Sequence, residues 1–129
     1  MRELKFWRCP LCGKLIWEVE ESDTVPICCG RAMVRLAGNY GGSAGEKHLP
    51  VAELTDGVIR VRVSTVPHPS LPDHYIEWIA LQCEDRTGFR FLEPGEAPDI
   101  TFNADGLAPE AVLAYCNLHG LWKGGVKKD

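Results

Sequence analysis

Val58-Ile59-Arg60-Val61-Arg62-Val63 alternates apolar and charged residues with a period of two. A β-strand places successive side chains on opposite faces, so this pattern predicts a strand with one buried and one solvent-facing side. Further short strands are expected between prolines and glycines, at residues 75–81, 88–92, 99–103 and 112–116. Residues 108–115 could instead form a helical turn, because Ala, Glu and Leu favour helix. Several short strands at this spacing predict a mainly β fold, a small antiparallel β-sandwich.

The distribution of cysteines divides the chain into two parts. Four of the six cysteines lie near the N-terminus, at Cys9, Cys12, Cys28 and Cys29. Residues 38–45 are rich in glycine and predict a flexible linker. We therefore expect a tetracysteine module at residues 1–37 and a larger sandwich domain at residues 46–129. The first module is too small to bury an adequate core and needs a staple such as a metal ion.

The composition argues against several classes of function. The 129 residues carry a formal net charge of −4, which disfavours nucleic acid or an anionic membrane as the main partner. No stretch approaches the roughly 18 apolar residues that a membrane helix needs. The N-terminal sequence has no sign of a secretory signal, so we expect a cytoplasmic protein. In that compartment cysteines indicate metal ligation rather than disulfides.

The four N-terminal cysteines have the spacing of a metal site. Cys9 and Cys12 are three residues apart, Cys28 and Cys29 are adjacent, and a glycine follows each pair. Four thiolates form a tetrahedral site suited to zinc or to a single iron. Adjacent cysteines must distort the backbone to reach one metal, and ordinary zinc ribbons use a second spaced pair instead. The pattern resembles desulforedoxin, which implies one iron bound by four thiolates, with an electron-transfer or structural role.

The remaining candidate ligands are four histidines and one cysteine: His48, His68, His74, Cys116 and His119. They lie in turn-rich segments beside predicted strand ends. Five ligands are too many for typical zinc, and a blue-copper site would add a methionine to two histidines and a cysteine. The only methionines are Met1 and Met33, and neither follows His119. Iron accepts four nitrogens with one axial sulfur and keeps a sixth position free, so this set predicts a catalytic iron.

The sequence around these ligands resembles a known family. Four segments are similar to the signature segments of superoxide reductase: Glu46-Lys47-His48, His68-Pro69, His74-Tyr75-Ile76-Glu77-Trp78 and Cys116-Asn117-Leu118-His119-Gly120-Leu121-Trp122. With the N-terminal module included, the chain resembles desulfoferrodoxin, the two-iron form. The resemblance implies an immunoglobulin-like sandwich and the one-electron reduction of superoxide to hydrogen peroxide. It also implies a cytoplasmic homodimer that receives electrons from a rubredoxin-type donor.

Two residues directly before His48 are expected to act on the substrate. The chain after residue 38 carries eight Lys and Arg against thirteen Asp and Glu, so its overall field repels the superoxide anion. We expect Lys47 to provide local attraction and to help deliver a proton through water. By resemblance to the family, Glu46 would occupy the sixth position of the oxidised iron and leave on reduction.

The sequence alone leaves three other functions open. They are a non-catalytic electron-transfer protein, a superoxide dismutase and a zinc-stabilised interaction module without redox activity. Zinc could also occupy the tetracysteine site of recombinant protein. The remaining cysteine, Cys83, is expected to be a buried strand residue rather than a ligand.

Overall fold

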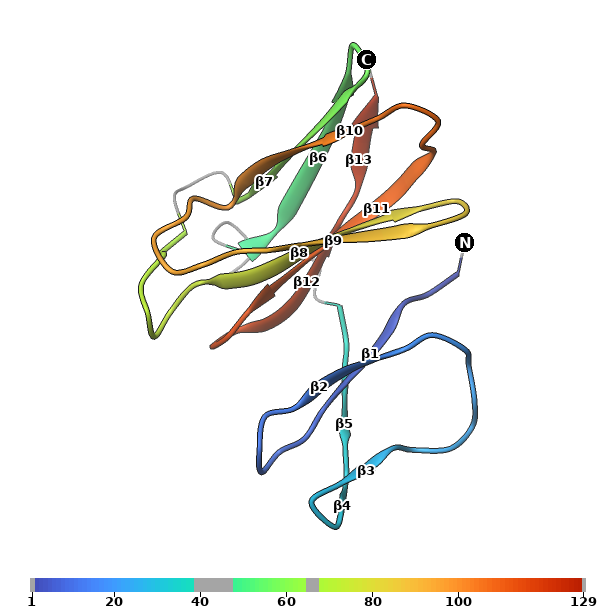
Figure 1. The fold of residues 1–129 in the computed structure, drawn as a ribbon, viewed down its shortest axis with the longest axis vertical. Helices are drawn as coiled ribbons and strands as arrows, with labels where there is room; N and C mark the ends of the chain where they lie inside the picture. The colour runs from blue at the N-terminus through green and yellow to red at the C-terminus, as the bar shows by residue number, and fades with distance from the viewer. Residues whose placement is uncertain (1, 39–47, 65–67, 129) are drawn as a thin grey trace. The chain divides into compact units, whose positions relative to one another are not determined.

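The computed structural model describes residues 2–38, 48–64 and 68–128 (Figure 1). The chain divides into two compact units, Met1–Ala37 and Gly38–Asp129. Most of the stretch predicted as a linker, residues 39–45, lies outside the described residues. The described part of the chain has no helix of the length and apolarity needed to cross a membrane.

The first unit is built from short strands. A three-stranded antiparallel sheet has the order β2-β1-β5, and a separate hairpin joins β3 to β4. The strands are β1 (Lys5–Arg8), β2 (Leu15–Glu18), β3 (Ile27–Cys28), β4 (Arg31–Ala32) and β5 (Val34–Leu36).

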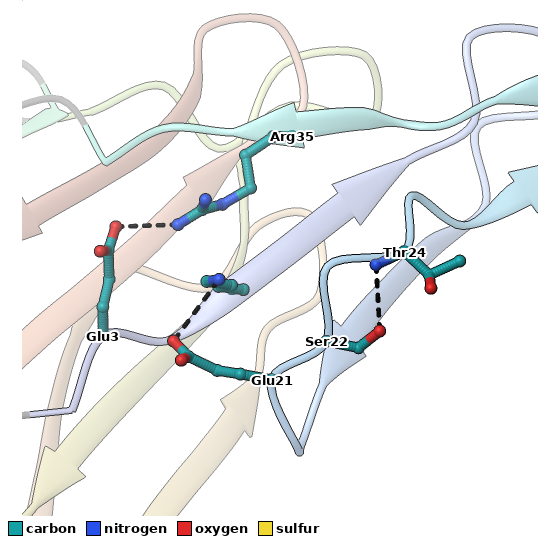
Figure 2. Close-up of polar contacts among 6 residues, drawn as sticks. Glu3, Glu21, Ser22, Thr24 and Arg35 are labelled. Carbon is teal, nitrogen blue, oxygen red and sulfur yellow. Dashed lines mark hydrogen bonds and ion pairs between the residues drawn. The ribbon is translucent and has the colours of Figure 1, made fainter.

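Few apolar side chains of the first unit are buried. Among its described residues they are Leu4, Phe6, Cys9 and Met33. Surface ion pairs add to this small core. Figure 2 shows Arg35 bound to Glu3, and the distance between the Arg35 nitrogen and the carboxylate oxygen is 2.8 Å. In a second pair, Lys5 Nζ lies 3.4 Å from the carboxylate of Glu21. Exposed pairs of this kind contribute about 1 kcal/mol or less each, so the unit depends on a further constraint.

The described residues of the second unit form two four-stranded sheets, in the orders β10-β7-β6-β13 and β12-β11-β8-β9. Among these strands every pairing is antiparallel except that of β13 with β6. The strands are β6 (Pro50–Thr55), β7 (Val58–Val63), β8 (Ile76–Cys83), β9 (Thr87–Phe91), β10 (Asp99–Asn103), β11 (Pro109–Cys116), β12 (Gly120–Gly124) and β13 (Val126–Lys128).

The predicted mainly β fold is confirmed. The alternating segment forms β7 over the same six residues, with Ile59, Val61 and Val63 buried and the residues between them exposed. The alternative of a helical turn at residues 108–115 is wrong, because that segment forms strand β11. Strand β11 lies between two neighbours in its sheet, and the ladder of hydrogen bonds with both outweighs the weak helix preference of Ala, Glu and Leu.

The core lies between the two sheets. One sheet contributes residues such as Ile59, Val61 and Ile100, and the facing sheet contributes Ile79 and Val112 among others. Burial of each large aliphatic side chain stabilises the fold by about 1.5–3 kcal/mol. The core therefore fixes how the sheets face each other (Figure 1), and it fixes the strand ends from which the candidate ligands extend.

Three strands place candidate ligands at the same end of the sandwich. Strand β8 begins two residues after His74, β6 begins two residues after His48, and β11 ends at Cys116. The β8–β11 register shifts at this end, since Tyr115 pairs with Trp78 but Cys116 pairs with Ile76. Such a bulge re-aims the side chains beside it. Cys116 is completely buried and belongs to the core cluster.

Candidate metal centres

The four N-terminal cysteines form the first cluster. Their sulfur atoms all lie within 4.8 Å of one another, and Cys12 Sγ is 3.7 Å from Cys28 Sγ. Cys9 is buried, whereas Cys12 and Cys29 are exposed, so the cluster lies at the surface of its unit. Four sulfurs from two separate turns therefore surround one small volume.

Two turns bring these sulfurs together. The first follows β1 and is closed by a hydrogen bond from Gly13 N to the carbonyl oxygen of Cys9, at 3.0 Å. The second lies between β3 and β4, where Cys29 and Gly30 both adopt left-handed backbone conformations, with φ of 54° and 71°. A left-handed conformation is uncommon for a residue other than glycine. It is the backbone distortion that adjacent cysteines require in order to face the same point.

The electrostatics of this cluster favour a bound cation. The backbone N–H of Cys12 lowers the pKa of Cys9 to about 6, which favours a thiolate there. Interaction with the neighbouring thiols, Cys12 first, raises the pKa of Cys29 to about 12, and the pKa of Cys28 is raised by the same neighbours. Four thiolates cannot coexist at this spacing without positive charge between them. The donor set fits a metal ion that binds tetrahedral sulfur.

The second cluster is formed at the end of the sandwich. Ligand atoms of His48, His68, His74 and Cys116 all lie within 4.8 Å of one another. His119 lies beside them: its Nδ1 is 3.7 Å from Cys116 Sγ, and its ring centroid is 4.5 Å from that of His48. Five residues that are separated by up to 71 positions (119 − 48) thus gather around one point.

Burial and hydrogen bonding leave this cluster suited to a metal. The Nε2 atoms of His68 and His74 are buried and have no hydrogen-bond partner among the described residues. Each such atom costs about 1–3 kcal/mol unless a partner binds it. His68 Nδ1 lies 2.6 Å from the carbonyl oxygen of Pro69. Because a carbonyl oxygen only accepts, Nδ1 carries the ring proton, and Nε2 keeps a free lone pair that can bind a metal. A metal ion bound by these nitrogens would supply the partner that the described part of the structure does not otherwise give them.

The His68 ring is neutral at physiological pH. Burial lowers the pKa of His68 to about 4, against an ordinary value of 6.5, although the Pro69 carbonyl acts in the opposite direction. A metal ligand must be unprotonated, so burial prepares this ring for binding.

Two residues outside the predicted ligand set support the cluster. Trp122 stacks on the ring of His48, with centroids 5.0 Å apart, and its Nε1 donates to the carbonyl oxygen of His119 at 3.1 Å. Asn117 bonds to the backbone on both sides of His74. In the sequence, the position of Asn117 between Cys116 and His119 is the one feature that could have indicated this supporting role.

The other predicted residues have different outcomes. Glu46 and Lys47 lie outside the described residues. Cys83 is buried in β8 and belongs to neither cluster, and burial raises the pKa of its thiol.

Comparison with known proteins adds independent information. The family model described as desulfoferrodoxin matches residues 41–125. A desulfoferrodoxin from Desulfarculus baarsii is 37% identical over 120 residues, which cover 93% of this chain and 94% of that protein. A superoxide reductase from Pyrococcus horikoshii is 35% identical, over 69% of this chain and 93% of that protein. The crystal structure of the superoxide reductase from Treponema pallidum superposes with a TM-score of 0.78 at 28% identity, covering 95% of this chain and 98% of that one.

Proposed function

The chain belongs to the desulfoferrodoxin family, and from this premise we propose that it is a superoxide reductase, an oxidoreductase that reduces superoxide to hydrogen peroxide. The observation that carries the proposal is the convergence of four histidine rings on the thiol of Cys116. The reaction consumes one electron and two protons for each superoxide and releases no oxygen.

We assign the catalytic iron to His48, His68, His74, Cys116 and His119. The two buried nitrogens without a hydrogen bond and the neutral state of His68 support this assignment. When bound in the ferrous state, the iron would supply the single electron that superoxide takes up. The thiolate of Cys116 would donate electron density to the metal, as the thiolate ligand does in P450 haem proteins, and here this would favour transfer of an electron to superoxide.

The substrate is an anion, and the charge of the chain works against it. Lys47 directly precedes a proposed ligand, and we propose that it attracts superoxide and relays a proton. Glu46 would alternate between binding the oxidised centre and leaving it, as the family resemblance implies.

The tetracysteine cluster is proposed to hold a second iron with a structural or electron-transfer role. Its sulfur-only donor set suits a single iron, and zinc would fit the same four thiolates equally well and could occupy them in recombinant protein. A rubredoxin-type protein in the cytoplasm is the proposed electron donor, and a homodimer is the proposed assembly. These three assignments rest on the family resemblance.

Rapid mixing of the reduced, iron-loaded protein with superoxide tests the function. We expect fast oxidation of the histidine–cysteine centre, which the appearance of its thiolate-to-ferric absorption would monitor. One hydrogen peroxide should form per superoxide. The absence of fast oxidation would refute the proposal. Release of oxygen at half the superoxide consumed, without net use of reductant, would indicate a dismutase instead. Zinc in both sites of protein purified from its own host would favour an interaction module.

A further inference from the structure

The side chain of Asn117 connects the two loops that carry three of the proposed ligands. Its Oδ1 accepts a hydrogen bond from Tyr75 N at 3.0 Å, and its Nδ2 donates to the carbonyl oxygen of Asp73 at 2.9 Å. A third bond joins the backbones, from Asn117 N to the carbonyl oxygen of Tyr75 at 3.3 Å. One residue is thereby bonded to the loop of His74 at three points.

The two side-chain bonds act on the peptide groups immediately before and after His74. The carbonyl of Asp73 belongs to the peptide that enters His74, and the N–H of Tyr75 belongs to the peptide that leaves it. The backbone N and O of His74 itself are bonded to Leu71, at 3.1 and 2.9 Å. The main chain on both sides of His74 is therefore fixed. Leu71 binds the backbone of His74 itself, and the Asn117 amide binds the Asp73 carbonyl before it and the Tyr75 N–H after it.

Asn117 itself is placed by the opposite loop. It directly follows Cys116 and precedes His119 by two residues. The chain leaves β11 at the register shift where Cys116 pairs with Ile76, so regular strand pairing ends at this point. The amide of Asn117 replaces that pairing across the two loops. The bond from Tyr75 N is partly buried, which limits competition from water there, whereas the bond to the Asp73 carbonyl is exposed.

Only an amide side chain of this length fits the arrangement. The site requires an acceptor for one N–H and a donor for one carbonyl on the same short side chain, which asparagine supplies. An aspartate keeps the acceptor but has no proton to donate to the Asp73 carbonyl, and an alanine loses both bonds.

We propose that Asn117 is a positioning residue for the catalytic metal centre, one that sets His74 at a fixed distance from Cys116 and His119. This inference rests on the proposed function only in taking those three residues as ligands of one metal. Residues that orient metal ligands from behind typically change metal affinity by about 10- to 100-fold when they are replaced. Asn117 touches neither the metal nor the substrate; it acts through the ligands.

Iron retention by the full-length, iron-loaded protein tests this role. Asn117→Ala, Asn117→Asp and a control, Asn103→Ala, are challenged with a competing iron chelator. Asn103 is a matched control because its Oδ1 also accepts a backbone N–H, from Asp105 at 2.9 Å, but in the other sheet, where Asn103 pairs with Val58. The absorption of the tetracysteine centre serves as an internal reference in every sample.

The expected result is a loss of iron affinity confined to the second centre. Asn117→Ala should bind that iron about 10- to 100-fold more weakly and shift its thiolate-to-ferric absorption, while Asn117→Asp should lose less. Asn103→Ala should retain wild-type affinity. If Asn117→Ala only lowers the melting temperature of the metal-free protein and keeps wild-type iron affinity and absorption, the residue is merely structural and the proposal is overturned. If that variant does not fold, wild-type affinity in Asn117→Asp overturns it equally.

The result is separable from that of the proposed function. A wild-type protein that binds iron in the second centre but fails to react with superoxide would refute the reductase activity and leave the role of Asn117 intact. Normal superoxide reduction with no effect of Asn117 on iron binding would do the reverse.

Discussion

Gly124→Ala is expected to damage the sandwich at the end that carries the metal ligands. Gly124 is the last residue of β12 and pairs with Val112 of β11. A Cβ at this position would overlap the carbonyl oxygen of Pro50 and would lie 2.9 Å from its carbonyl carbon. Pro50 is the first residue of β6, in the opposite sheet. The overlap is with main chain, which cannot rotate away, so the two sheets would have to separate locally.

The expected cost follows from this geometry. Overpacking usually costs about 1–3 kcal/mol, and a collision with backbone belongs at the upper end. In a domain of this size 3 kcal/mol lowers the melting temperature by about 12–24 °C. Since His48 lies two residues before Pro50, the displacement would also reach a proposed ligand. We therefore expect weaker iron binding at the second centre together with lower stability.

Gly125→Ala provides the matched control. A Cβ at Gly125, which directly follows Gly124 and lies between β12 and β13, would meet no atom within 4 Å. This variant should be neutral or more stable by about 0.4–1 kcal/mol, because alanine restricts the unfolded chain. Urea unfolding followed by circular dichroism measures both variants in the metal-free full-length protein. A free energy of unfolding for Gly124→Ala within about 0.5 kcal/mol of wild type would refute the reasoning, since surface substitutions alone reach that range.

Three further predictions concern the metal centres. Cys116→Ser should abolish the thiolate-to-ferric absorption of the second centre and leave that of the first unchanged. The control Cys83→Ser, at the other buried cysteine of the sandwich, should leave both absorptions unchanged. Persistence of both bands in Cys116→Ser would contradict the ligand assignment. The metal-free protein should lose stability as pH falls from 6.5 towards about 4, since the unfolded chain takes up a proton that His68 refuses in the fold. The loss should reach roughly 3 kcal/mol and should shrink in His68→Gln, as urea unfolding at pH 7.5 and 4.5 would reveal. Lys47→Ala should react with superoxide more slowly and with less dependence on salt, while its iron content stays normal; unchanged stopped-flow rates would remove Lys47 from the mechanism.

Local sequence patterns were sufficient for the fold class. The alternation in residues 58–63 reports a strand with one buried face, because the period of side chains along a strand is two. Within the sandwich, strands β6, β12 and β13 were not predicted, and none of the short strands of the first unit was. Strand β12 begins and ends with glycine, and β13 is only three residues long and pairs in parallel with the distant β6. Their strand conformation is imposed by partners elsewhere in the chain, which a local pattern cannot report.

The residue types alone were sufficient to predict the metal-binding chemistry of the site. Four imidazoles and a thiolate outside the tetracysteine cluster define a metal donor set without any coordinates, and adjacent cysteines imply the backbone distortion that is found at Cys29. These conclusions require only the donor properties of side chains and their spacing over a few residues.

Only the tertiary structure decided how that donor set is assembled. The register shift that ends β11 at Cys116, the amide of Asn117 across two loops and the contact of Gly124 with Pro50 all join residues that are far apart in the sequence. Side-chain chemistry is a property of each residue alone, and the sequence therefore determined which atoms could bind a metal. The convergence of those atoms on one point depends on sheet pairing and core packing between distant segments, which exist only in the folded chain.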